Sequence, residues 1–378
     1  MFNLKTINIK HYINITLILL IPTFTHAAVI TVTTGDRYTS TNGLCSINEA
    51  ISNANDDATT YPDCEAGSGA DTINLSVNVS LDRYFESDST YGQTGTPAIT
   101  SEIILDGMSY TIQRTGAPSC NINGDNQNYE FRFFRIASGG FLTLQNMTIK
   151  NGCPDGTNNE SKSGGAIFNE GSLEVYNSLF VENHALFGGA IGNNEGTIND
   201  IANNTFSHNV SNSKGGAIYN FYSSIINSVT NNTFIDNWAT NGGAIYNYNE
   251  INNLNNNLFS ENTAVDANDD CDNYQTGTVT GANNLSNQSI NDCANAGIAS
   301  GINPDNIGLL DDYGCINPTA QGDCVHSYIL IFDSIAKDAG DENSTTFDQR
   351  GFAANGIRDI GAFESQGIID LIYKSSFE

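Results

Sequence analysis

The sequence predicts an all-β protein, a right-handed parallel β-helix with disulfide-stapled terminal caps. Three observations predict this fold: an internal repeat, the lack of helical periodicity within it, and cysteines confined to the two ends. Gly-Gly-Ala-Ile followed by two residues, the second always Asn, begins at positions 164, 188, 215 and 242. Repeats of this length mark proteins built from stacked supersecondary units.

A second repeated word, Phe-x-x-Asn, alternates with the first. Its copies are Phe180–Asn183, Phe206–Asn209, Phe234–Asn237 and Phe259–Asn262. Glycine pairs and many Asn and Thr residues argue against helix, whereas alternation such as Leu173–Tyr176 indicates strands of a few residues. Strands this short are stable only when stacked on neighbouring copies, as in a β-helix. A leucine-rich repeat would need Leu at fixed positions that are missing here.

Each repeated position has an expected role. The first glycine of each pair, at 164, 188, 215 and 242, turns the chain with a positive φ, and the second permits close backbone approach. The isoleucines and phenylalanines stack as buried columns. The asparagines form amide ladders at corners; a polar binding row is the alternative. The residues concerned are Gly165, Gly189, Gly216, Gly243, Ile167, Ile191, Ile218, Ile245, Phe180, Phe206, Phe234, Phe259, Asn169, Asn193, Asn220 and Asn247, with Asn183, Asn209, Asn237 and Asn262 at a second corner.

The N-terminus has the features of a secretory signal peptide over residues 1–27. Lys5 and Lys10 precede a short apolar run, Ile13–Ile21, and Thr25-His26-Ala27 supplies a cleavage site. The run is too short to span a bilayer as a helix. A buried element of the first domain is the alternative. We therefore expect an exported chain that begins at Ala28, is not an integral membrane protein and is secreted or held at the cell surface.

The composition agrees with export. The chain has 14 Lys and Arg against 42 Asp and Glu, a formal net charge of -28. This negative field disfavours nucleic acid, anionic polysaccharide and anionic membrane surfaces as partners. With 39% hydrophobic residues, the chain can still build a core.

Eight cysteines fall into four close pairs, which indicates disulfides in an exported chain. Neighbour pairing is the simplest expectation, although the sequence does not fix the connectivity. The expected pairs are Cys45 with Cys64, Cys120 with Cys153, Cys271 with Cys293, and Cys315 with Cys324. All of them lie outside residues 154–270, so the disulfides staple the two ends.

The ends differ from the repeat. Val29–Thr33 reads as a first strand and Ser46–Ala54 as a helix, with Ser46 and Glu49 at the spacing of a capping box. Such a helix can plug the open end of a solenoid. Residues 103–107 and 141–149 read as strands that precede the repeat. We expect a cap and first coils at 28–120, the β-helix at 121–265, an irregular disulfide-bearing segment at 266–367 and a tail at 368–378.

Three motifs resemble known families. The alternating GGAI and FxxN words are similar to the repeats of chlamydial polymorphic membrane proteins, whose β-helical regions are adhesins. Leu44–Ile51 resembles the CSLREA motif of secreted bacterial repeat proteins, but has Ile47 and Asn48 where Leu and Arg are usual. Arg358–Glu364 is similar to the closing segment of choice-of-anchor Q proteins. These resemblances imply the fold and the location of the protein, but they say little about its activity.

No catalytic or cofactor-binding residue emerges from the sequence. The parallel β-helix also hosts pectate lyases and polygalacturonases, whose chemistry needs basic residues with bound calcium, or closely set acids. Between residues 151 and 262 there is no Arg, and the two lysines, Lys162 and Lys214, lie in turns where we expect them to be solvated. No histidine is flanked by glycines. We expect no clustered catalytic acids in the repeat.

Calcium is a weaker possibility. Asp266, Asp269, Asp270 and Asp272 crowd into one segment, but Cys271 and Gly277 occupy positions where an EF-hand loop needs Gly and Glu. A loose Ca²⁺ site and a solvated charge run are both compatible with this pattern.

The sequence therefore favours a monomeric surface-binding or adhesin-like protein without cofactors, for an extracellular glycan or protein ligand. A polysaccharide-active enzyme, either a lyase or a glycoside hydrolase, is the alternative. A basic cleft with convergent acids would favour the enzyme, and a flat polar face with aromatic residues would favour binding. Phe221, Tyr222, Tyr246 and Tyr248 follow GGAI words and are candidates for such a face.

Overall fold

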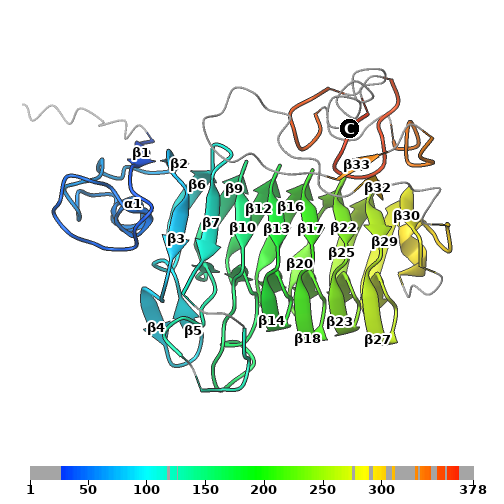
Figure 1. The fold of residues 1–378 in the computed structure, drawn as a ribbon, viewed down its shortest axis with the longest axis horizontal. Helices are drawn as coiled ribbons and strands as arrows, with labels where there is room; N and C mark the ends of the chain where they lie inside the picture. The colour runs from blue at the N-terminus through cyan, green and yellow to red at the C-terminus, as the bar shows by residue number, and fades with distance from the viewer. Residues whose placement is uncertain are drawn as a thin grey trace, which may run out of the picture.

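The chain winds into a parallel β-helix whose sheets run along its axis (Figure 1). The structure is a computed structural model. It describes residues 27–116, 120–125, 127–274, 277–288, 293–303, 309–310, 328–330, 333–341, 347–353 and 356–365. The all-β fold predicted from the repeat is confirmed. The signal peptide and the tail predicted at the two ends of the chain lie outside the described residues, apart from Ala27.

Two long sheets run along the coil. Sheet 1 contains β1 (Val29–Val32), β2 (Asp71–Leu75), β6 (Glu102–Asp106), β9 (Phe141–Gln145), β12 (Ser172–Tyr176), β16 (Thr197–Ala202), β20 (Ile225–Ile226), β21 (Val229–Thr230), β25 (Glu250–Asn255) and β29 (Thr278–Ala282). Sheet 2 contains β3 (Val79–Leu81), β7 (Thr111–Arg114), β10 (Thr148–Lys150), β13 (Leu179–Val181), β17 (Thr205–Ser207), β22 (Thr233–Ile235), β26 (Leu258–Ser260), β30 (Asn284–Ser286) and β31 (Ile298–Ala299).

Two shorter sheets close the coil. Sheet 3 contains β8 (Phe134–Ile136), β11 (Ile167–Asn169), β15 (Ile191–Asn193), β19 (Ile218–Asn220), β24 (Ile245–Asn247) and β28 (Cys271–Asn273). Sheet 4 contains β14 (His184–Phe187), β18 (Val210–Lys214), β23 (Trp238–Asn241) and β27 (Thr263–Ala267). Outside them are the antiparallel pairs β4 (Glu86–Asp88) with β5 (Gly92–Thr94) and β32 (Leu309–Leu310) with β33 (Ile329–Leu330), and the helices α1 (Ile47–Asp56) and η1 (Ala294–Ala296).

One coil passes through the sheets in the order 3, 1, 2 and 4, after which a glycine pair leads to the next coil. The register places like residues on like residues. Ile167 pairs with Ile191, and Phe180 pairs with Phe206. The repeat words therefore mark structurally equivalent positions in successive coils.

The predicted columns form the core. The isoleucines of sheet 3 and the phenylalanines of sheet 2 that belong to the repeat are fully buried. The rings of Phe206 and Phe234 are stacked with their centroids 4.9 Å apart, and Phe234 and Phe259 are 5.0 Å apart. This spacing is that of neighbouring strands, as the repeat predicts.

Asparagine ladders occupy three corners of the coil. In each ladder, a side-chain amide donates to the side-chain oxygen of the equivalent residue in the next coil. The ladder between sheets 3 and 1 joins Asn169, Asn193, Asn220, Asn247 and Asn273. The one between sheets 2 and 4 joins Asn183, Asn209, Asn237 and Asn262, and at its end the Asn262 amide donates to the carboxylate of Asp270. A third ladder, which was not predicted from the sequence, lies between sheets 1 and 2 and joins Asn204, Asn232, Asn257 and Asn284.

Glycines occupy the fourth corner. Gly215 has a φ of 67°, in the left-handed region, and the first glycine of every other copy has a similar value. A Cβ on Gly216 would lie 1.9 Å from the carbonyl oxygen of Gly243 in the next coil. The first glycine thus provides the positive φ of the turn, and the second permits the close approach of stacked backbones, where no side chain fits. Both expected roles of the glycine pair are present.

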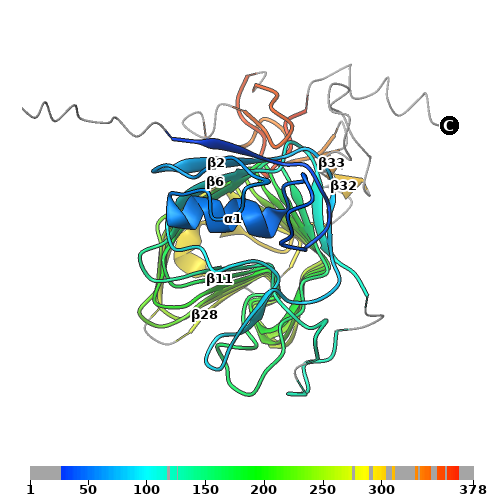
Figure 2. The same ribbon diagram turned by 90° about the vertical axis from the view of Figure 1, so that its left-hand side faces the viewer.

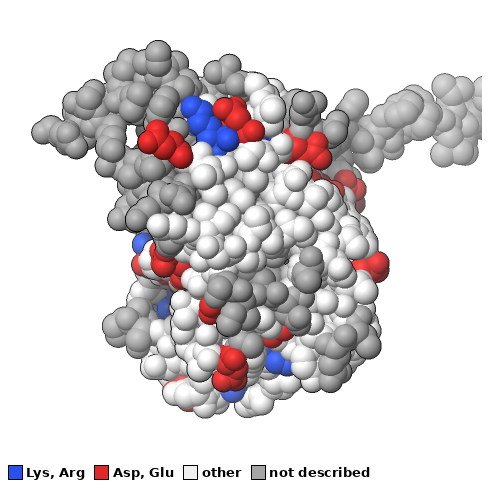
Figure 3. All heavy atoms as spheres, turned by 90° about the vertical axis from the view of Figure 1, so that its right-hand side faces the viewer, with Lys and Arg blue, Asp and Glu red and all other residues white. Residues whose placement is uncertain are grey.

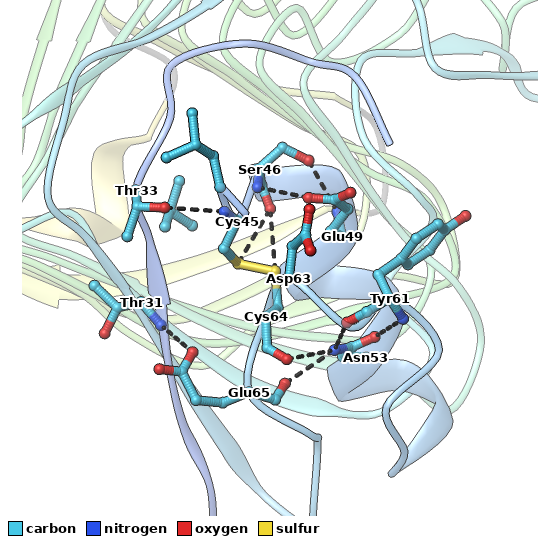
Figure 4. Close-up of a disulfide and its surroundings, with 12 residues drawn as sticks. Thr31, Thr33, Cys45, Ser46, Glu49, Asn53, Tyr61, Asp63, Cys64 and Glu65 are labelled. Carbon is cyan, nitrogen blue, oxygen red and sulfur yellow. Dashed lines mark hydrogen bonds between the residues drawn. A yellow bond between two sulfur atoms is a disulfide. The ribbon is translucent and has the colours of Figure 1, made fainter. Parts of the chain in front are cut away.

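Helix α1 lies across the N-terminal end of the coil (Figure 2). Ser46 caps it, and the side chains of Ser46 and Glu49 form the predicted capping box. The disulfide Cys45–Cys64 ties the start of this helix to the following loop (Figure 4). Asn53 donates to the carbonyl oxygens of Tyr61 and Glu65, which closes the same loop.

The other end departs from the expectation that the period fades from Asp266. Strands β28, β29 and β30 pair in parallel with β24, β25 and β26 and so add a further coil. The disulfide Cys271–Cys293 is in this coil, and Cys120–Cys153 is near the start of the repeat. Cys315 and Cys324 lie outside the described residues. In Figure 3 this end of the molecule presents mainly uncharged side chains among the described residues.

The C-terminal segment folds back over the outside of sheet 2, where it appears in orange to red in Figure 1. The amide of Ala362 donates to the Thr233 hydroxyl at 3.1 Å, and the Thr205 hydroxyl donates to the Gln349 side-chain oxygen at 2.6 Å. Arg358, which is buried, pairs with Glu364 at 3.0 Å. Residues 347–365 therefore cover the flank of the coil.

Candidate binding surface

The outer face of sheet 3 is built from the middle residue of each three-residue strand. Because side chains alternate along a strand, this residue points outward while the flanking Ile and Asn point inward. The strand register joins these outward positions into one row: Arg135, Phe168, Gly192, Tyr219, Tyr246 and Asp272. The repeat thus places the rings of Tyr219 and Tyr246 side by side on the outer face of sheet 3, where both are largely covered.

A second row flanks the first, just beyond the Asn corner. The amides of Phe221, Tyr248 and Tyr274 donate to the carbonyls of the ladder asparagines one coil earlier, which sets the rings at equivalent positions. The centroids of Tyr248 and Tyr274 are 5.1 Å apart, and those of Tyr246 and Tyr274 are 6.0 Å apart. We call the set of Tyr219, Phe221, Tyr222, Tyr246, Tyr248 and Tyr274 the tyrosine shelf.

Only part of the shelf is accessible. Tyr222 is 63% exposed and Tyr274 is 37% exposed, whereas Tyr246 is 1% exposed. Tyr248 is half-buried between them. Of the four aromatic residues proposed from sequence, Tyr222 and Tyr248 can therefore contact a ligand, while Phe221 and Tyr246 support them from below. Tyr274 completes the accessible face.

Lys214 lies against the shelf. Its Nζ is 4.7 Å from the ring centroid of Tyr246 and 5.2 Å from that of Tyr274. Burial lowers the pKa of this lysine, and the opposing charge of Asp272 partly offsets that shift. The expectation of a solvated side chain is therefore wrong for Lys214, because sheet 4 ends beside the shelf and directs the lysine across the rings.

Burial also controls the phenols of the shelf. It raises the pKa of Tyr219 to about 12 and raises the pKa of Tyr246 well above its ordinary value. Both phenols are neutral at physiological pH. The surface thus combines apolar rings and hydroxyl groups with a cation, Lys214, and the carboxyl group of Asp272.

A carboxylate pair lies on the outer face of sheet 1. Glu174 of β12 is the register partner of Asp200 of β16, and Tyr176 is in electrostatic contact with both. Desolvation raises the pKa of Asp200, and the Glu174 charge adds to this effect. This pair of neighbouring acids was not predicted from the sequence, and the expectation that the repeat holds no clustered catalytic acids stays a prediction. A register shift beside Leu173 aligns Glu174 with Asp200, and the sequence alone did not reveal it.

The proposed calcium ligands have other partners. Asp270 ends an asparagine ladder and also accepts from the Ser286 hydroxyl, while Asp269 accepts from the amide of Ala264. Asp272 faces the shelf, and Asp266 is exposed. Within the described part of the chain, these four residues do not form a group that could hold a metal ion.

A different acidic group could hold a cation: Asp125, Glu130 and Asp155 have ligand atoms within 4.8 Å of one another. The disulfide Cys120–Cys153 joins the two loops that supply them. Burial raises the pKa of Glu130, so protonation is a second way to relieve the repulsion between the carboxylates. No sequence motif marks this group, because its members come together only through the tertiary fold.

Comparison with known families identifies the repeat type. The Chlamydia polymorphic membrane protein repeat model matches residues 205–220 and 233–248. Each match runs from a Phe-x-x-Asn word to a GGAI word, which in the structure is the path from sheet 2 through sheet 4 to sheet 3. The match covers these two stretches of the chain. No curated protein matches. In the described residues, no helix is long and apolar enough to cross a membrane.

Proposed function

We propose that this chain is an exported, surface-exposed binding protein whose tyrosine shelf holds an uncharged extracellular glycan. The shelf is the observation that carries the proposal, because half-exposed aromatic rings with polar rims are typical of recognition surfaces. The repeat match and the disulfides support a location outside the cytoplasm.

The size of the shelf favours a glycan over a protein ligand. A stable protein interface buries about 800 Å² per partner. An aromatic side chain offers roughly 150–250 Å² when it is wholly covered, and Tyr222, Tyr248 and Tyr274 are already partly buried. Three such rings suit a few sugar units stacked by their apolar faces. The formal net charge of -28 favours a neutral glycan over an acidic one.

The test is a glycan array followed by titration calorimetry with the full exported chain. Tyr222→Ala and Tyr274→Ala should each raise the dissociation constant roughly tenfold, which corresponds to a loss of about 1.4 kcal/mol of binding free energy. Neither change should alter the stability of the fold by much. Tyr38→Ala is the matched control, since Tyr38 is also exposed, at 57%, but belongs to the N-terminal cap. Binding that is unaffected in both shelf variants, or confined to protein ligands, would contradict the proposal.

A glycoside hydrolase remains the second candidate, and the pair of Glu174 and Asp200 is the observation that favours it. Glycosidases use one protonated and one ionised carboxyl group, and the raised pKa of Asp200 provides that asymmetry. The measurement is turnover of neutral polysaccharides by the wild type and by Asp200→Asn and Glu174→Gln. Turnover that is abolished in both variants would establish the enzyme; no turnover by the wild type leaves binding as the function.

A further inference from the structure

Arg132 is an arginine enclosed within the protein without a carboxylate partner. Its side chain is fully buried, and no ion pair joins it to an acidic group of the described residues. Nη2 donates to the carbonyl oxygens of Glu160 at 2.8 Å and Ser161 at 2.7 Å. Among the residues that the structure describes, Nε and Nη1 have no hydrogen-bond partner. Within this part of the chain, the guanidinium thus has only neutral oxygens for partners, and two of its three nitrogens have none.

The surroundings do not neutralise this charge. The guanidinium carbon is 4.7 Å from the ring centroid of Phe168, which gives a cation–π contact but no counter-charge. Glu170, whose carboxylate favours the charged form of Arg132, is bound to Arg135 at 2.9 Å, and Arg135 itself repels Arg132. The carboxylate of Glu170 is therefore already engaged by Arg135 and does not pair with Arg132.

An uncompensated buried charge is costly. Even after relaxation, the desolvation penalty of an ion is several kcal/mol, and an unsatisfied buried N–H adds to it. Desolvation lowers the pKa of Arg132 to about 9. The guanidinium is still mostly charged at neutral pH, so the cost is not removed by loss of a proton. Arg358 shows the usual solution, since this buried arginine pairs with Glu364 at 3.0 Å.

We propose that Arg132 holds a small inorganic anion of the halide class as a structural ligand, bound through Nε and Nη1. Such an ion supplies the missing negative charge and accepts the two free N–H groups. Because the side chain is fully enclosed, the ligand is an ion small enough to be trapped in the fold, and not the carboxyl group of a larger molecule. The site is formed where the loop of residues 154–163 meets β5 and β8.

Thermal unfolding of the full exported chain tests this site. At constant ionic strength, sodium chloride replaces sodium gluconate, whose anion is too large for an enclosed site. The midpoint of unfolding of the wild type should rise by roughly 2 °C or more for each tenfold increase in chloride once the site begins to fill. Arg132→Met should lose this dependence. Arg114→Met is the matched control, because Arg114 is buried but donates to the carbonyls of Asn151 and Tyr129.

A chloride response shared by Arg132→Met would overturn the proposal, since it would then be a general salt effect. Because the Arg132→Met protein can fail to fold, crystals of the wild type grown in bromide provide a second test. An anomalous bromide peak beside Nε and Nη1 supports the site. A water molecule at that position, without anomalous signal, refutes it.

Discussion

At the scale of single residues, the ladder asparagines form hydrogen bonds with buried backbone amides and carbonyls at the corners of the coil. The side-chain oxygen of Asn237 accepts from the amide and from the side chain of Asn209, and its side-chain nitrogen donates to Phe206 and Asn262. Asn237 thus satisfies groups of the preceding and the following coil and links three successive coils. Buried polar groups without partners are expensive, so each corner requires this residue type.

Replacing Asn237 with Ala should cost about 3 kcal/mol of unfolding free energy, because it leaves buried partners unsatisfied. Chemical denaturation of the purified protein measures the loss. Asn252→Ala is the control, since this Asn is exposed on β25, and it should change stability by less than about 0.5 kcal/mol. Equal stability of the two variants would show that the ladder is not needed.

Loss of a stacked phenylalanine should lower the unfolding free energy by at least as much as loss of a ladder asparagine. Phe234→Ala should cost about 3–5 kcal/mol, because the ring is buried between Phe206 and Phe259 and its removal leaves a cavity. The same denaturation experiment measures it. A Phe234→Ala protein as stable as its parent would contradict the role of the aromatic column.

Asp200 gives a prediction with a definite pH dependence. Its pKa is raised in the folded state, so the folded protein binds more protons and loses stability as pH rises from the ordinary carboxyl pKa of about 3.9 through the raised value. Asp200→Asn removes this loss. The variant should therefore be more stable relative to the wild type at pH 7 than at pH 3, as measured by denaturation at both values. A difference that grows toward acid would reverse the assigned direction.

At the scale of elements, the sequence predicts best where local chemistry and stacking agree. The glycine corner, the Phe column, the first two ladders and the capped helix α1 each follow from a repeated word or a cap pattern. The third ladder was missed, although Asn-Asn precedes the Thr-Phe or Leu-Phe of successive copies from 203 onward. Asn203 and Asn231 have positive φ values of 59° and 54°, so the first Asn of each pair makes the turn and the second forms the ladder.

The candidate surface was predicted only in part. The sequence placed aromatic residues after the GGAI words, but which rings are exposed depends on the packing of Lys214 and the second row. Glu174 and Asp200 are neighbours through a register shift that no periodicity reveals. Arg132 is enclosed by loops, outside the repeat pattern. These features depend on contacts between segments distant in sequence, which a repeat of residue types does not encode.

The glycine corner supplies a prediction for one element. Gly216→Ala should cost roughly 3 kcal/mol or more, because the new Cβ would overlap the Gly243 carbonyl oxygen and force successive coils apart. Gly139→Ala is the control: Gly139 has a φ of 90° but no atom within 4 Å of the added Cβ, so only the backbone cost of about 1–2 kcal/mol applies. Thermal or chemical unfolding compares them. A smaller loss for Gly216→Ala would contradict the close approach.

At the scale of the whole molecule, each coil contacts mainly its neighbours, so stability is nearly a sum of local terms along one axis. Breaking Cys271–Cys293 with the double change to Ser should cost about 2–4 kcal/mol and loosen the last coils first. Hydrogen exchange should speed up in β28, β29 and β30 while β1 and β2 keep wild-type rates. Uniform acceleration along the chain would indicate a single cooperative unit instead.

The ladders also give the solenoid a chemical direction. Every ladder amide donates toward the next coil, and the last members end on acceptors within the chain: Asp270, the Ala296 carbonyl and the Gly277 carbonyl. The last amide of each ladder therefore requires an oxygen, and at the other end the side-chain oxygens of Asn169, Asn183 and Asn204 accept from the backbone amides of Gly171, Gly152 and Ser178. Two uncapped molecules would join head to tail, and such contacts do not close but propagate into filaments. Helix α1 and the terminal acceptors keep this protein from becoming the repeating unit of a fibre.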